Sequence, residues 1–352
     1  MIEFKKQLSR KMVATLFCCT ILAQAKIDMP VFLLSGQSNM TGYASAGDLS
    51  ADQKKTVDNV KIYMDLVWEG DASKLRKWLT LGPGFGSNAN NIGPELFMGR
   101  TLSEAMPGKK IALIKCSSGS TYLGKSSDWL PPSSNNGNGG TLYKRMISTI
   151  NTALKGINAV IDTTQYTPRW AGFVWLQGEF DAQDQNLANA YEKNLTNLIN
   201  DIRKDLKISD LPVIIPMIDV QGQWRYNSTV RAANIAVTKK LTNVDTLDTK
   251  GFSTDGTHYK GQGQVKIGTY TAQRWLKMDY KYGPTVSAEY HHITQTSASL
   301  APVATSRVLF DLSGRKITTP DRLLNGTHPY TGVLLSKTSQ NGQCLKMLFV
   351  GE

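Results

Sequence analysis

Short apolar runs alternate with amphipathic segments along most of the 352-residue chain. The apolar runs combine aliphatic, aromatic and β-branched residues, which predicts buried strands at residues 30–34, 60–64, 111–114, 170–176 and 212–218. The segments between them repeat apolar residues at helical spacing, which predicts helices at residues 94–105, 142–154, 187–206, 230–241 and 263–276. This alternation is typical of an α/β domain whose parallel sheet is covered by helices on both faces.

Polar and glycine-rich segments mark the loops and the end of this domain. Residues 82–92 and 131–140 are rich in Gly, Asn and Ser, which predicts two long loops. Residues 283–306 are rich in Ser, Thr, Ala and Pro and predict a linker, and residues 307–352 carry short alternating runs separated by glycine. We therefore expect an α/β domain over residues 26–282, followed by the linker and a small all-β module.

The amino-terminal segment has the pattern of a secretory signal. Basic residues precede an apolar run from Met12 to Ala23, which ends in the small-residue sequence Ala23-Gln24-Ala25. The run is shorter than the roughly 20 residues that span a bilayer. It predicts a cleaved signal peptide over residues 1–25, with export from the cell or to its surface. A buried helix or a membrane anchor is the alternative.

Charge and cysteine content narrow the class of protein. The formal net charge is +12, but Lys and Arg are scattered and no nucleic-acid-binding motif accompanies them, so we expect a solvated surface and no nucleic-acid partner. After cleavage of the signal only Cys116 and Cys344 remain, far apart and in different predicted regions. A disulfide framework is therefore not expected.

A serine directly follows the first predicted strand, in the sequence Gly36-Gln37-Ser38-Asn39-Met40. A serine at a strand-to-helix turn can be exposed above a sheet, and Gly36 can adopt the backbone angles that such a turn needs. Met40 stands where the Gly-x-Ser-x-Gly elbow has its second glycine. A serine that begins a helix is also a common N-cap, so this segment alone leaves nucleophile and cap equally open.

The candidate base for this serine is identified by the positions of the histidines. The chain has four histidines, of which His291 and His292 fall in the predicted linker and His328 in the tail. His258 is therefore the one histidine of the α/β domain, and Asp255 precedes it by three residues. A histidine oriented by an acid can activate a serine hydroxyl. The same count argues against a multi-histidine metal site in this domain, and we expect no metal or organic cofactor.

Polar residues follow two other predicted strands. Gln177 and Glu179 follow residues 170–176, and Gly119 comes shortly after residues 111–114. In a parallel sheet these strand ends meet at one edge. A neutral amide there can donate to a developing oxyanion, a glycine lets substrate approach the backbone, and a carboxylate can act as a second acid. Polar loops that only satisfy backbone groups are the alternative for each segment.

Together these segments resemble the SGNH-type hydrolases, in particular the branch of carbohydrate esterase family 6 and the sialate O-acetylesterases. The matching blocks, in the order of the family, are residues 36–40, 93–95, Lys115 with Gly119 and Thr121, residues 177–181, and residues 255–258. Ser118 stands where a second glycine is common in the third block. The resemblance covers essentially the whole α/β domain.

The resemblance implies a flavodoxin-like three-layer domain with a shallow, open site. It implies Ser38 as nucleophile, His258 as base and Asp255 as the acid that orients it, with Glu179 as the alternative acid. The oxyanion donors that it implies are the backbone N–H groups of Ser38 and Gly119 and the side-chain amide of Gln177.

The substrates implied are acetyl esters on plant polysaccharides, chiefly acetylated xylan. A sialate O-acetylesterase would use the same groups and is the alternative. A non-catalytic glycan-binding protein on an esterase fold would have lost a catalytic residue, whereas Ser38, Asp255 and His258 are all present. Residues 310–316 are similar to the carboxy-terminal sorting domain of the type IX secretion route, which implies contact with secretion machinery. A carbohydrate-binding accessory module is the alternative.

Overall fold

The computed structural model describes residues 25–219 and 222–283, together with the backbone of four short strands nearer the carboxyl terminus. The chain divides into two compact units, Met1–Thr294 and Gln295–Glu352. Almost all of the predicted signal peptide, most of the predicted linker, and Cys344 lie outside the described residues.

A seven-stranded sheet forms the centre of the first unit, in the order β4-β3-β6-β1-β7-β8-β9. Its strands are β1 (Ile27–Gly36), β3 (Val57–Leu66), β4 (Trp78–Leu81), β6 (Ile111–Ser117), β7 (Tyr166–Leu176), β8 (Val213–Pro216) and β9 (Val244–Leu247). Every neighbouring pair is parallel except β3 and β4. The predicted α/β class with a mostly parallel central sheet is confirmed.

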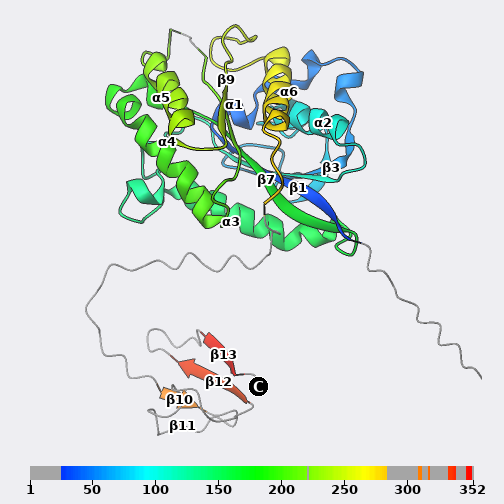
Figure 1. The fold of residues 1–352 in the computed structure, drawn as a ribbon, viewed down its shortest axis with the longest axis vertical. Helices are drawn as coiled ribbons and strands as arrows, with labels where there is room; N and C mark the ends of the chain where they lie inside the picture. The colour runs from blue at the N-terminus through cyan, green and yellow to red at the C-terminus, as the bar shows by residue number, and fades with distance from the viewer. Residues whose placement is uncertain are drawn as a thin grey trace, which may run out of the picture. The chain divides into compact units, whose positions relative to one another are not determined.

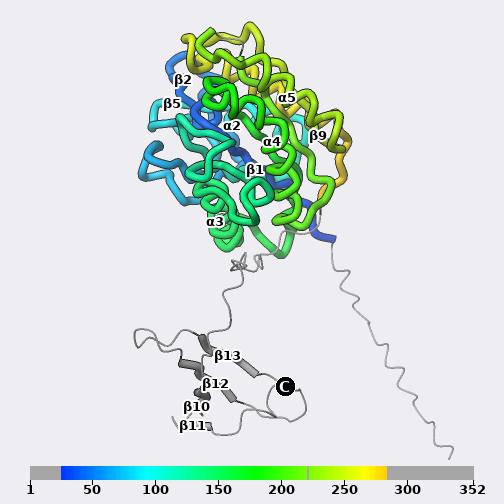
Figure 2. Tube along the Cα trace, turned by 90° about the vertical axis from the view of Figure 1, so that its left-hand side faces the viewer, coloured from blue at the N-terminus to red at the C-terminus, as the bar shows by residue number. Residues whose placement is uncertain are grey.

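Helices cover both faces of this sheet (Figure 1). On one face lie α2 (Glu95–Ala105) and α6 (Gly261–Lys277), and on the other α3 (Thr141–Gly156), α4 (Gln185–Asp205) and α5 (Asn227–Lys240). Alternate residues of β1 point to opposite faces of the sheet. Leu33 packs in the layer of α3, α4 and α5, and Leu34 packs in the layer of α2 and α6. Both are fully buried, which explains why the strand reads as a continuous apolar run. Figure 2 shows β1 inside the domain.

Short elements complete the two units. A turn of helix, α1 (Ser38–Thr41), follows β1, and β2 (Ala44–Ser45) pairs with β5 (Asn91–Ile92). In the second unit, β10 (Val308–Phe310), β11 (Lys316–Ile317), β12 (Gly332–Lys337) and β13 (Lys346–Val350) form an antiparallel sheet in the order β11-β10-β12-β13. Among the residues described, no helix has the length and apolar character needed to cross a membrane.

The strand order places a topological switch point between β1 and β7. The chain leaves β1 toward β3 on one side and leaves β7 toward β8 on the other, so the connections diverge at this point. The register sets Gly36 beside Ser117 of β6 and Leu176 of β7, so the residues that follow these three strands converge. Gly36 has φ 146°, and a Cβ here would lie 2.0 Å from the carbonyl oxygen of Leu176, so only glycine fits.

Candidate active site

Ser38 is the first residue of α1, which follows the end of β1 at this switch point. Gln37 is the N-cap residue, no side chain makes a capping hydrogen bond, and Gln37 N donates to Leu176 O at 3.0 Å. The alternative in which Ser38 caps the helix is therefore wrong. Ser38 is 8% exposed, and within the described part of the chain no acceptor takes the backbone N–H of Ser38 or of Gly119.

Gly119 lies beside this serine. A Cβ on Gly119 would be 3.7 Å from Ser38 Cβ, 3.4 Å from the Tyr43 hydroxyl and 2.9 Å from Glu69 Oε1. A larger residue would press on the Glu69 carboxylate. The strand-end glycine predicted from the sequence therefore lies where a backbone N–H can approach the same space as the Ser38 side chain.

Asn39 joins the serine turn to the histidine turn. Its Nδ2 donates to Glu179 Oε1 at 2.7 Å and approaches Thr257 O at 3.4 Å, and its Oδ1 accepts from Tyr259 N at 3.1 Å. Because residues 257 and 259 flank His258, one buried side chain next to Ser38 fixes both sides of the predicted base. Asn39 O also accepts from Gln264 Nε2 at 3.0 Å, which ties the turn to α6.

Asp255 and His258 form a closed turn. Asp255 Oδ1 accepts from the backbone N–H of Thr257 at 2.9 Å and of His258 at 2.8 Å, and Asp255 N donates to His258 O at 3.0 Å. Partial burial acts to raise the pKa of Asp255, but these N–H bonds hold it below its ordinary value, so the group stays ionised. No hydrogen bond among the described residues joins this carboxylate to the imidazole, and its effect there is electrostatic.

The imidazole is held by an aromatic ring. Tyr43 stacks on His258 with ring centroids 4.3 Å apart and an angle of 6° between the planes. Burial lowers the pKa of His258 below its ordinary 6.5, and the Asp255 charge opposes this in part. The imidazole is therefore largely neutral at pH 7, which is the form that accepts a proton.

Glu69 supports the stacked tyrosine. The Tyr43 hydroxyl donates to Glu69 Oε1, while Glu69 Oε2 is buried without a hydrogen-bond partner. Burial raises the pKa of Glu69 even against the hydrogen bond from Tyr43. The sequence reasoning missed both residues, because an isolated Tyr and Glu in turns carry no local signature of a stack that forms only in the folded chain.

Glu179, the alternative acid, is in a different environment from Asp255. It is 1% exposed, its Oε1 accepts from Asn39, and its Oε2 has no partner. Burial raises the pKa of Glu179 to about 7. The structure therefore brings Glu179 to the histidine turn through Asn39, whereas Asp255 is part of that turn.

Gln177 has other partners than an oxyanion. It is fully buried, and its Nε2 donates to Thr121 O at 2.9 Å, to Asp181 Oδ2 at 2.7 Å and to Gln37 Oε1 at 3.2 Å. With its amide hydrogens engaged, the side chain ties strand ends together. Its assignment as a third oxyanion donor stays a prediction, which requires the amide to exchange one of these partners for the oxyanion.

A buried ion pair lies beneath α1. Lys115 Nζ donates to Glu95 Oε2 at 2.6 Å, to Thr41 O at 2.9 Å and to Phe85 O at 2.7 Å, and both charged side chains are 0% exposed. Burial lowers the pKa of Lys115, although the Glu95 charge acts in the opposite direction. These residues of the matched blocks hold the end of α1 in place.

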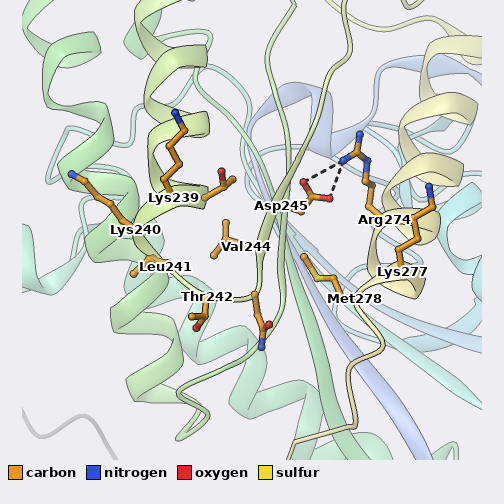
Figure 3. Close-up of a pocket in the computed structure, with 11 residues that line it drawn as sticks. Lys239, Lys240, Leu241, Thr242, Val244, Asp245, Arg274, Lys277 and Met278 are labelled. Atoms are coloured by element: carbon orange, nitrogen blue, oxygen red, sulfur yellow. Dashed lines mark hydrogen bonds and ion pairs between the residues drawn. The ribbon is translucent and has the colours of Figure 1, made fainter.

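Two further features lie outside this cluster. The described residues contain no group of three His, Cys, Asp or Glu side chains placed to hold a metal ion. A pocket of about 520 Å³ lies between the ends of α5 and α6 beside β9 (Figure 3), where Arg274 pairs with Asp245 at 3.0 Å. Lys239 and Lys277 also line it, but none of the predicted site residues does.

Comparisons with known proteins agree with this geometry. The sequence profile of the family described as carbohydrate esterase, sialic acid-specific acetylesterase, matches residues 28–277. A probable carbohydrate esterase of Arabidopsis thaliana is 27% identical over 265 residues, covering 70% of this chain and 90% of that protein. An X-ray structure of an Arabidopsis thaliana protein has a TM-score of 0.56 at 23% identity, covering 70% and 98% of the two chains. The crystal structure of NanS has a TM-score of 0.54 at 14% identity, covering 72% and 98%. The two structures are similar to this chain in fold.

Proposed function

The chain belongs to the carbohydrate esterase family of sialic acid-specific acetylesterases, and on that premise we propose that it removes O-acetyl groups from plant polysaccharide, chiefly acetylated xylan. Membership makes it a carbohydrate ester hydrolase. The observation that carries the proposed mechanism is the convergence of Ser38, Gly119 and the His258 turn at one edge of the sheet.

The proposed reaction is a two-step acyl transfer. Ser38 Oγ attacks the acetyl carbonyl while the His258 imidazole takes the hydroxyl proton. The tetrahedral intermediate collapses as His258 returns that proton to the departing sugar oxygen, which leaves an acetyl ester on Ser38. Water, deprotonated by His258, then attacks this ester and releases acetate and the free serine.

Supporting groups are assigned from their contacts. Asp255 stabilises the imidazolium that forms at His258, because its charge favours the protonated ring. The free backbone N–H groups of Ser38 and Gly119 are the proposed donors to the oxyanion. Glu179 acts through Asn39 as a positioning residue.

The charges around the site favour a neutral sugar chain. The ionisable side chains against Ser38, Gly119 and His258 include Tyr43 and the acids Glu69 and Asp255, and the charge of Lys260 acts on Asp255. The carboxylate of a sialic acid would be repelled by an ionised Asp255, whereas xylan carries no charge at its acetylated rings. The description of the family nevertheless makes hydrolysis of O-acetylated sialic acid the second candidate.

The Ser38→Ala variant tests the mechanism. We expect it to lose about 10³-fold or more in release of p-nitrophenol from its acetate ester, with unchanged circular dichroism and melting temperature. Retained activity in this variant would exclude Ser38 as the nucleophile.

Acetate release from a substrate panel tests the specificity. Acetylated xylan and O-acetylated sialic acid are compared by kcat/KM with the same enzyme preparation. A higher value for xylan supports the proposal, and a higher value for the sialic acid selects the second candidate. The Ser38→Ala protein is the blank for both substrates.

We also propose that the chain is exported by its amino-terminal segment and sorted by its carboxy-terminal unit. The support is the signal-like pattern of residues 1–25 and the sorting-like pattern of residues 310–316. Amino-terminal sequencing of the exported protein should begin at Lys26. Deletion of residues 307–352 should prevent release, and release of the shortened chain would contradict the sorting role.

A further inference from the structure

Trp68 is an exposed residue in the turn after β3, next in sequence to Glu69. Its residue surface is 97% exposed. The other six tryptophans are buried or partly buried: Trp129, Trp170 and Trp175 at 0% exposure, Trp224 and Trp275 at 5%, and Trp78 packed against the core. A large apolar ring left in solvent loses the stabilisation that burial gives to the rest of its kind.

The backbone at Trp68 is also unfavourable for this residue. Its φ is 64°, in the left-handed region that disfavours bulky side chains. The turn is anchored on both sides, since Val67 N donates to Ser117 O at 3.3 Å and Gly70 N donates to Ser87 O at 2.8 Å. An anchored turn therefore keeps the indole outside the core.

The position of this turn connects it with the nucleophile. β3 ends at Leu66, at the same sheet edge as Gly36 and Ser117. The residue after Trp68 is Glu69, whose carboxylate accepts from the Tyr43 hydroxyl and borders Gly119. Trp68 is thus one residue away from the wall of the proposed site.

We propose that Trp68 is an aromatic platform that binds a sugar ring of the polysaccharide chain carrying the acetyl ester. The inference rests on the proposed function and extends it from the ester to the neighbouring rings. A pyranose ring such as xylose has faces of C–H groups that pack on a flat indole, while its hydroxyls stay in water. Such binding increases the affinity for chains and contributes little to a substrate without a sugar.

Kinetics with two substrates test the platform. For acetylated xylo-oligosaccharides, Trp68→Ala should lower kcat/KM about tenfold, mainly through KM, and Trp68→Phe should retain most of the wild-type value. For p-nitrophenyl acetate the loss should be much smaller. The matched control is Tyr270→Ala on α6, an aromatic residue with 39% exposure whose ring packs against Phe252, and it should leave both substrates unaffected.

A binding measurement separates this proposal from the catalytic one. In the Ser38→Ala protein, iodide should quench mainly Trp68, because the other tryptophans are shielded. Unacetylated xylo-oligosaccharide should protect that fluorescence, and the protection should vanish in the Ser38→Ala, Trp68→Ala double variant.

Three outcomes would overturn the platform. The first is unchanged oligosaccharide KM in Trp68→Ala, and the second is absence of protection. The third is a dimer that Trp68→Ala converts to a monomer in gel filtration, because the indole would then serve a second copy of the chain. Each leaves the Ser38 mechanism standing if Ser38→Ala has abolished ester hydrolysis, so the two failures are distinguishable.

Discussion

Asn39 joins the Ser38 turn to the His258 turn, but different kinds of structure support the two turns. Around Ser38 the support is buried: Asn39 is 3% exposed, and the Lys115–Glu95 ion pair beneath α1 is fully enclosed. Around His258 the same Asn39 is joined by a support at the surface: Asp255 is exposed, and its hydrogen bonds stay within its own turn.

The contrast separates stability from catalysis. Removing a buried support leaves an uncompensated charge or polar group inside the protein, so the cost falls on the free energy of unfolding. Removing an exposed residue such as Asp255 leaves the fold intact and alters the pKa or orientation of the His258 imidazole. The expected loss is therefore in kcat. The next experiments test this division from the largest expected effect to the smallest.

Lys115→Met should destabilise the domain by about 3–5 kcal/mol, because it leaves the Glu95 carboxylate buried without its partner. Denaturant unfolding followed by fluorescence measures the change. The matched control is Lys55→Met, which removes an ion pair with Asp52 whose side chains are 70% and 86% exposed, and should change stability by less than about 0.5 kcal/mol. Equal effects in the two variants would show that burial of the first pair does not matter.

Asp255→Asn should lower kcat by roughly 100-fold with little change in melting temperature. The asparagine Oδ1 can still accept from the backbone of the turn, but the charge that favours the imidazolium is gone. The pKa of His258 should fall further below 6.5, so the acid limb of the pH–rate profile should move to lower pH. A limb that stays in place would argue against electrostatic coupling between these two groups.

Glu179→Gln is the paired variant on the buried side. Its kcat loss should be smaller than that of Asp255→Asn, because Gln can still accept from Asn39.

The pKa of Glu179 in the folded protein is about 7 against an ordinary 4.5, so the native state holds the proton more tightly than the unfolded chain. Wild-type stability should therefore decrease as the pH rises from about 4.5 to 7, and Glu179→Gln should lose less over this range. If Glu179→Gln lost more kcat than Asp255→Asn, Glu179 would be the acid that orients His258.

Tyr43→Ala should lower kcat about tenfold, since the imidazole loses the ring that fixes its plane, while Tyr43→Phe keeps the stack and most of the rate. Loss of the ring exposes His258 to water, so its pKa should rise toward 6.5. The acid limb should move to higher pH, opposite in sign to Asp255→Asn. NMR titration of the imidazole checks the direction, and a shift to lower pH would contradict the role of burial by Tyr43.

The order and type of the main elements could be predicted because their cores are continuous apolar runs. β7 and β1 are buried on both faces along most of their length, so their sequences are nearly unbroken runs of apolar residues. β9 was missed because Val244 and Leu247 flank two partly exposed polar residues, and no apolar run remains to detect. β4 was missed because it is a short edge strand with one buried residue, Leu81.

The site could be predicted only where its residues are close in sequence or follow strands. Ser38, Gly119 and the Asp255–His258 turn were named in this way, and the structure brings these segments close together. Tyr43, Glu69 and Trp68 were not, because their roles arise from contacts across the fold or from exposure. Gln177 was also named from its place after a strand, but its sequence position does not reveal that its amide donates to Thr121 and Asp181.

Asn39 has one more consequence, for the time course of folding. Its partners lie 140 to 225 positions along the chain, at Glu179, Tyr259 and Gln264. Contacts of such long range close large loops and form late. The Ser38 turn cannot be joined to the histidine turn and to α6 until these late segments have docked, so newly made chains should lack activity until the domain is complete. Ester hydrolysis is therefore delayed until α6, the last helix of the α/β domain, is in place.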